Sequence, residues 1–210
     1  MWSWASGKGS SEVARKRSLD GGPGVAPLIL DHAAHLFYSK GYEQASIRDL
    51  AESAGISPST VYHHFENKQE IAYQVIIRFM RDFNEVTIPV MRNPEHTALS
   101  RITEAVRLHI EISDKRRPEL LRLRGFRSIL SEAQGQEVTS LELAYHDAMK
   151  GLIIEGCESG EFFTPNATLA TMAVLDMLNG VRSWFSQDGV LSLSEVVHIY
   201  TVMVHKLLAS

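Results

Sequence analysis

The twelve residues SPSTVYHHFENK, at Ser57–Lys68, bring together hydroxyl, phenol, imidazole and ammonium groups that could bind a metal, catalyse a reaction or contact a partner. His63 and His64 are adjacent, and neighbouring residues of a helix point about 100° apart, so the two rings cannot hold one metal ion well. A Ser-Pro pair is typical of a helix start. The pattern therefore favours a contact surface over a chelate or a catalytic dyad.

Other groups that could do chemistry lack the residues that would complete them. The His-Ile-Glu at 109–111 resembles the zinc-deaminase motif, but that motif needs two further cysteines and Cys157 is the single cysteine. Cys157 with His146 could form a nucleophile pair, yet no third group orients them, and a structural cysteine is the alternative. G-x-S-x-G, P-loop and dinucleotide fingerprints do not occur. We expect neither an enzyme nor a protein with a metal or other cofactor.

Composition limits the class of protein further. The chain has 210 residues, of which 44% are hydrophobic and 22% charged, which is ordinary for a globular protein. It contains neither an apolar run of about 20 residues, as a membrane span needs, nor the apolar core of a signal peptide. One cysteine excludes a disulfide framework. These features predict a cytoplasmic protein with no membrane partner.

Apolar residues recur with helical spacing from Pro27 almost to the end, which predicts an all-α fold. Helix starts are expected at Pro27, at Ser46 with Asp49 in a capping box, and at Ser57-Pro58. Further helices are predicted near 68–88, 97–114, 118–131, 136–158, 167–186 and 193–208. No segment alternates convincingly with the period of two that a strand needs.

The spacing of three residues indicates a helix-turn-helix. Counting from Ile47, the fifth residue is Ala51, the ninth is Gly55 and the fifteenth is Val61. A small alanine lets the helices cross closely, a glycine adopts a positive φ in the turn, and a branched apolar residue fixes the second helix on the first. Capped helix starts on both sides strengthen this interpretation.

At this point the chain resembles the DNA-binding domain of the TetR family of transcriptional regulators, over about residues 27–73. The residues that carry the resemblance are LF…GY at Leu36–Tyr42, SIRDLA at Ser46–Ala51, AGIS at Ala54–Ser57 and TVYHHFENK at Thr60–Lys68. The resemblance implies an N-terminal three-helix head that reads the major groove and a C-terminal helical bundle for ligand binding and dimerisation. We expect a flexible basic arm at 1–24, the head at 25–73 and the body at 74–210.

Residue chemistry and the resemblance together predict the residues that contact DNA. They are Ser46, Ser57, Pro58, Ser59, Thr60, Tyr62, His63, His64 and Lys68. Lys68 resembles the family's phosphate-binding lysine, and the helix starts at Ser46 and Ser57 are natural phosphate sites. A structural alternative stays open for several of them: both serines cap helices with or without DNA, Tyr62 could pack on its own domain, and Lys68 could be an ordinary surface lysine.

The predicted head is acidic, which is unusual for a surface that meets DNA. Residues 27–73 contain three cationic and six acidic side chains, a net charge of −3. We therefore expect few ion pairs with phosphates, a shallow dependence of DNA affinity on salt, and contacts made mainly by neutral donors.

The body contains large apolar side chains that could fill a core or line an effector cavity. Those assigned to the cavity are Phe79, Phe83, Met91, Phe126, Tyr145, Met149, Met172 and Trp184. The last helix is apolar nearly all round, which indicates cover from two sides. The resemblance implies a dimer through the last two helices, and the residues assigned to it are Gly180, Val196, Tyr200, Met203 and Leu207.

The function predicted from these features is a ligand-responsive, homodimeric DNA-binding regulator. It would repress transcription from a palindromic operator and be released by a small hydrophobic effector. The C-terminal stretch also resembles the regulators of lipid and steroid catabolism in this family, which implies an acyl-CoA as effector. The alternative is a helical small-molecule-binding protein or enzyme whose head no longer binds DNA.

Overall fold

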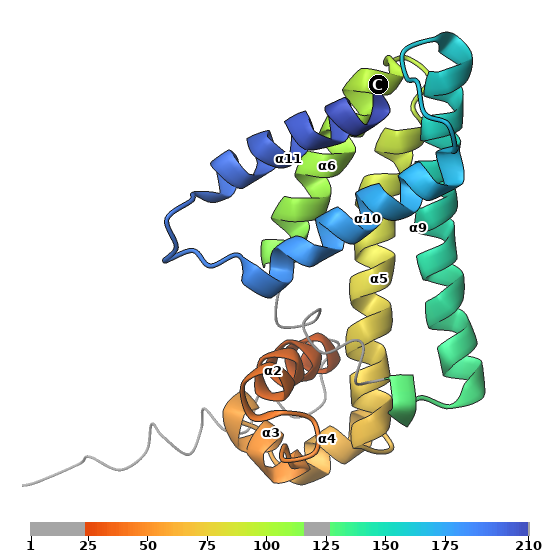
Figure 1. Cartoon of the computed structure of the whole chain (residues 1–210). Coiled ribbons are helices and arrows are strands. Elements are labelled where there is room, and N and C mark those ends of the chain that lie inside the picture. Colours follow the sequence, from red (N-terminus) through yellow and green to blue (C-terminus); the bar gives the residue numbers. More distant parts are fainter. Residues whose placement is uncertain (1–23, 116–126, 210) are drawn as a thin grey trace, which may run out of the picture. The chain divides into compact units, whose positions relative to one another are not determined.

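The computed structural model describes residues 24–115 and 127–209, and these ranges contain eight α-helices and one 3-10 helix. Their extended backbone pairing is limited to an isolated bridge between Phe163 and Ala209. The all-α prediction is confirmed. The chain divides into two compact units, residues 1–75 (the head) and residues 76–210 (the body) (Figure 1). Nearly all of the predicted arm, and residues 118–126 of one predicted helix, lie outside the described residues.

The head is built from α2 (Val25–Lys40), α3 (Ile47–Ala54) and α4 (Pro58–His64). Ile29 of α2, Leu50 of α3 and Val61 of α4 are each at most 1% exposed, so each helix contributes to the core of the head. Gly55 has the positive φ of 67° that the turn between α3 and α4 requires. The helix-turn-helix predicted from residue spacing is therefore present.

Helix starts follow the capping residues of the sequence. The Ser46 hydroxyl accepts a hydrogen bond from the Asp49 backbone N–H at 3.1 Å, and the Asp49 carboxylate accepts one from the Ser46 backbone N–H at 2.9 Å. Ser192 caps the last helix in the same way with Glu195. A capping box at Ser131, which the sequence reading missed, starts the helix of 132–159 four residues earlier than predicted.

Helix α5 (Lys68–Arg92) crosses the boundary between the two units. It continues past the predicted end near residue 88, with Pro89 inside the helix. Two contacts account for the added turn. Met91 is 1% exposed, and the Arg101 guanidinium donates a hydrogen bond to the Met91 carbonyl at 3.0 Å while it pairs with Glu155 at 2.8 Å.

The body consists of the rest of α5 with α6 (Ala98–Lys115), α9 (Glu132–Ser159), α10 (Ala167–Trp184) and α11 (Leu193–Leu208), and a 3-10 turn at Arg127–Ile129. Helix α6 contacts α9, α10 and α11, as Figure 1 shows for the last two. Fully buried residues on these helices form the core, among them Ile102, Ile110, Met149, Leu152, Ile153 and Leu178.

Candidate nucleic-acid interface and internal cavity

Helix α4 presents one polar face to solvent. Ser59, Tyr62 and His63 occupy positions i, i+3 and i+4, so they lie on the same side of the helix, and all three are exposed. Tyr62 is 57% exposed, so more than half of this residue is accessible to a partner even though the rest packs on its own domain. Pro58, one turn before Tyr62, is exposed as well. These four residues, Pro58, Ser59, Tyr62 and His63, are called the outer face of α4.

The opposite side of α4 packs into the head. Val61 is 0% exposed and Thr60 is 7% exposed. The Thr60 hydroxyl lies 2.8 Å from the Ser57 hydroxyl, which also caps the Thr60 backbone N–H at 3.2 Å. Thr60 was predicted to contact DNA, and the structure corrects this prediction because the side chain is buried. Ser57 is exposed, but its oxygen already serves the helix cap and contacts Ser59 at 2.7 Å.

His64, at the end of α4, is only half-buried. Its Nε2 atom is buried and has no hydrogen-bond partner in the described part of the chain, and its ring stands edge-on to His63 with centroids 5.3 Å apart. Nε2 therefore cannot reach a phosphate. Of the two ring nitrogens of His64, only Nδ1 could make the predicted contact with a phosphate.

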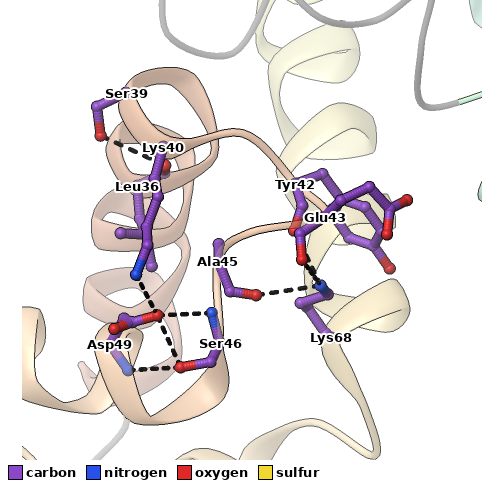
Figure 2. Close-up of polar contacts among 9 residues, drawn as sticks. All are labelled: Leu36, Ser39, Lys40, Tyr42, Glu43, Ala45, Ser46, Asp49 and Lys68. Atoms are coloured by element: carbon purple, nitrogen blue, oxygen red, sulfur yellow. Dashed lines mark hydrogen bonds and ion pairs between the residues drawn. The ribbon is translucent and has the colours of Figure 1, made fainter.

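The Ser46 side chain, at the start of α3, is hydrogen-bonded to neighbouring residues (Figure 2). Its hydroxyl donates to the Asp49 carboxylate at 2.7 Å, and the same carboxylate oxygen accepts from Lys40 at 2.8 Å. The Lys40 and Ser46 hydrogen bonds hold the pKa of Asp49 well below its usual range. A phosphate at Ser46 would meet this carboxylate, and the serine has no hydroxyl hydrogen left to donate. The structure thus disagrees with the predicted DNA contact of Ser46.

Lys68, at the start of α5, binds the loop between α2 and α3 (Figure 2). Its ammonium donates to the backbone carbonyls of Tyr42 at 2.8 Å, Ala45 at 3.1 Å and Glu43 at 3.5 Å. It also lies 4.2 Å from the centroid of the Tyr42 ring. An ammonium has three hydrogens, so these carbonyls use all of them. Lys68 holds the loop in place, so it is not an ordinary surface lysine, and its predicted contact with a phosphate stays a prediction.

Arg48 is a candidate contact that the sequence reading missed. Of the three cationic side chains in residues 27–73, Lys40 pairs with Asp49 and Lys68 binds the loop. Arg48 lies in the first turn of α3, is exposed and makes no ion pair with the part of the chain that is described. Counting charges could not single it out, because the pairing of the other two depends on tertiary contacts.

The body contains a partly open cavity of about 470 Å³ between α5, α6, α9 and α10. Three of the residues assigned to an effector cavity line it: Phe79, Phe83 and Tyr145. Four others do not, because Met91 and Met149 are packed in the core at 1% and 0% exposure, while Met172 and Trp184 lie on the surface at 49% and 50%. Phe126 lies outside the described residues.

The cavity also has polar residues that were not predicted. On α6 they are His109 and Ser113, on α10 Asn179 and Arg182, and α9 adds Thr139, Glu142 and His146. His109 Nδ1 lies 2.9 Å from the Tyr145 hydroxyl, and the Phe83 ring stands edge-on to both rings, with centroids 5.3 and 4.9 Å away. Burial, with a smaller effect of the Arg182 charge, lowers the pKa of His109 to about 3. Burial also raises the pKa of Tyr145 well above its usual value. Both groups are therefore neutral at neutral pH.

The competing chemical interpretations find no support in the geometry. Within residues 24–115 and 127–209, no three His, Cys, Asp or Glu side chains lie together as a metal site. Cys157 and His146 lie about three turns apart on α9, and His146 bonds to Asp147 at 3.3 Å. No helix in the described ranges is long and apolar enough to cross a membrane.

Two family models cover most of the chain. Residues 29–75 match the bacterial regulatory proteins of the tetR family, and residues 95–208 match the tetracyclin repressor-like C-terminal domain. The chain belongs to the TetR family of transcriptional regulators. The proteins that carry these domains regulate transcription and are not enzymes, so the predictions of family and of a non-enzymatic role are confirmed.

Individual TetR relatives match most of the chain. The chain is 21% identical to the HTH-type transcriptional repressor KstR2 of Rhodococcus jostii over 196 residues, which covers 87% of this chain and 90% of that protein. The TetR-family regulator PfmR of Thermus thermophilus has 27% identity and a TM-score of 0.78, with 85% of this chain and 97% of the other covered. AibR, solved with isovaleryl coenzyme A and operator DNA, shares the fold at 20% identity and a TM-score of 0.76, with 85% and 96% covered.

The last two helices of this TetR-family chain carry an exposed apolar surface. Ile199, Met203 and Leu207 follow one another at four-residue spacing on α11, and they are 42%, 47% and 37% exposed. On α10, Trp184 is half exposed and stacks on Tyr200, with ring centroids 6.2 Å apart. These five residues are called the outer patch of the body.

One dimer residue predicted from the sequence, Val196, differs in its burial from the outer patch. Val196 is 0% exposed, so it packs inside its own protomer and its assignment to a dimer surface is corrected. Gly180, on α10, is half-buried. Helix α11 is apolar nearly all round, and the structure shows which side faces the core.

Proposed function

We propose that the chain is a homodimeric repressor that binds a palindromic operator through the outer face of α4 and leaves it when a hydrophobic effector fills the cavity of the body. The observation that carries the proposal is that outer face, where neutral donors are exposed on a helix whose other side is anchored in the head. Its family membership supports a role in transcription.

Reading of the major groove would use α4 as the recognition helix, because the second helix of a helix-turn-helix enters that groove. Tyr62 and His63 offer one phenol and one imidazole to phosphates or base edges, and Ser59 offers a hydroxyl at the first turn. Arg48 adds an exposed cationic side chain that makes no ion pair with the described residues. Lys68 would contribute to DNA binding indirectly, because it holds the loop at Tyr42–Ala45 in place.

Dimerisation would use the outer patch on α10 and α11. A monomer that exposes Trp184, Ile199, Met203 and Leu207 leaves apolar side chains in water, and pairing two copies about a twofold axis would cover them. Two heads related by a twofold axis match a palindromic DNA site. Replacing Met203 with Glu should therefore give a monomer that binds operator weakly, as sedimentation velocity and a gel shift would reveal.

Effector release would work through α5. Its residues Ile76, Phe79, Met80 and Phe83 line the cavity, and the same helix begins at Lys68 in the head. A ligand that prefers one position of α5 changes the preferred arrangement of the two heads in a dimer. We propose an acyl-CoA thioester as the effector class, supported by the apolar cavity and by AibR, whose structure contains isovaleryl coenzyme A.

The test is a gel shift of the full-length protein with DNA from upstream of its own gene, with random-sequence DNA as the control. The whole proposal is supported if the protein shifts this DNA specifically, protects a twofold-symmetric site in a footprinting experiment, and is released from the DNA by octanoyl-CoA or another acyl-CoA. A specific footprint that no acyl-CoA affects removes only the effector class. Failure to bind any DNA in a genome-wide selection would instead favour a small-molecule-binding protein whose acidic head no longer reads DNA.

A further inference from the structure

The His109–Tyr145 pair is the feature of the cavity that bears most directly on ligand chemistry. Both side chains line the cavity and are 4% and 7% exposed. They come from different helices, α6 and α9, and the edge of the Phe83 ring packs against both. In the described part of the chain, the 2.9 Å contact between them is the only hydrogen bond that either side chain makes.

The number of polar hydrogens in the pair shows that one hydrogen-bond donor remains for a ligand. A neutral imidazole has one N–H and a phenol has one O–H, so the pair owns two hydrogens and their mutual bond uses one. If Tyr145 donates, the spare hydrogen is on His109 Nε2; if His109 donates, it is on the Tyr145 oxygen. Either tautomer therefore leaves one donor for which the described residues supply no acceptor, and this donor can serve a ligand in the cavity that both side chains line.

The rest of the lining sets the charge that a ligand can carry. Arg182 and Glu142 both line the cavity, so the formally charged side chains of the lining offset one another. His109 adds no charge at neutral pH, because burial and Arg182 hold it in the neutral form. A buried carboxylate would lose its hydration without a net positive charge to replace it, whereas an uncharged oxygen would not.

We propose that the His109–Tyr145 pair donates a hydrogen bond to the carbonyl oxygen of an uncharged ligand group, such as a ketone, ester or thioester, carried on an apolar chain that lies against Phe79 and Phe83. The cavity thus selects against the free carboxylate of the same chain length. This inference rests on the proposed function, because it names the group that the effector cavity recognises. In an acyl-CoA, that group is the thioester carbonyl.

Two eight-carbon probes separate the carbonyl from the carboxylate: 2-octanone and octanoate. Isothermal titration of the full-length protein at pH 7.5 should show 2-octanone binding about tenfold more tightly than octanoate, the size of effect expected when one ligand satisfies the donor and the other must lose hydration. Equal affinity, tighter binding of octanoate, or binding of neither compound would overturn the proposal.

Variants connect this selectivity to the pair. The double variant His109→Leu/Tyr145→Phe removes both donors, and the preference for 2-octanone should fall at least about fivefold. Phe79→Leu is the matched control: it trims the apolar wall, so both affinities should fall together and their ratio should stay. If circular dichroism shows that the double variant is unfolded, His109→Phe/Tyr145→Phe, which keeps a ring at both positions and also removes both donors, is judged by the same ratio. An unchanged ratio in the folded variant contradicts the inference.

A gel shift with the operator separates this outcome from the proposed function. If the protein binds its operator but shows no preference for 2-octanone, the carbonyl inference fails and the proposed role as a DNA-binding regulator stands. If the protein prefers 2-octanone but binds no DNA, the carbonyl inference stands and the proposed role as a repressor fails.

Discussion

In the head, two of the described cationic side chains bond to the protein itself while the outer face of α4 is exposed to solvent, whereas in the body a neutral His-Tyr pair is buried beside a cavity. Lys68 and Lys40 show the first arrangement: one binds three loop carbonyls and the other pairs with Asp49. His109 and Tyr145 show the second. In both units the donors proposed to give specificity carry no formal charge, and Lys68 serves to hold the backbone of a loop.

The largest effect is expected where the head would meet DNA. Changing Tyr62 and His63 together to Ala should weaken operator binding by more than about 100-fold, because both side chains lie on the outer face of α4. The melting temperature should hardly change, since surface substitutions usually stay within about 0.5 kcal/mol. Fluorescence anisotropy and thermal melts measure the two quantities. Glu66→Ala, an exposed change just beyond α4, is the control and should bind at least as well as the original protein.

A comparison of two lysines tests how the head uses its charges. Lys68→Met should destabilise the head by about 2 kcal/mol, because charge-assisted hydrogen bonds to the loop are lost. Lys40→Met breaks an exposed ion pair and should cost less than about 1 kcal/mol. Urea unfolding and hydrogen exchange of the amides at 42–45 report the difference. If Lys68→Met lowers DNA affinity and its salt dependence without lowering stability, the lysine is a phosphate ligand after all.

As pH falls, the body should lose stability before the head does. Between its folded pKa of about 3 and its unfolded value near 6.5, His109 binds more protons when the chain is unfolded, so stability falls as pH falls below about 6.5. His205, whose pKa is also lowered by burial, acts in the same direction. His109 contributes a slope of at most about 1.4 kcal/mol per pH unit.

Asp49, in the head, has a lowered pKa, so its contribution to stability persists until pH falls below the usual carboxyl range near 4. Urea unfolding from pH 8 to pH 4 should therefore show an earlier loss in the body, and His109→Leu should flatten part of it. A stability that stays level between pH 7 and pH 5 would contradict the buried neutral histidine.

Local signals in the sequence predicted much of the fold. Ser46, Ser57 and Ser192 start helices because a cap acts on residues three positions away, and Gly55 takes its positive φ within a short turn. The helix-turn-helix follows from such local rules. The capping box at Ser131 was equally local, so that missed start was available in the sequence.

Roles that depend on tertiary contacts could not be predicted in the same way. Lys68 resembles a phosphate ligand until the loop carbonyls 23 to 26 residues away are placed beside it. Helical spacing indicates that Met91 and Met149 face inward, but only packing separates a core from a cavity wall. An all-round apolar helix likewise cannot reveal that Val196 faces its own core and Met203 faces outward.

The salt dependence of operator affinity tests the central claim most directly, because the claim is that neutral donors, not lysines, carry DNA binding. Anisotropy titrations of the wild-type protein between 50 and 300 mM salt, conditions in the range where counterion release is measured, give the slope of log K against log salt. We expect a slope no steeper than about −5. A slope of about −9 or steeper, equivalent to ten or more neutralised phosphates per dimer, would contradict the account.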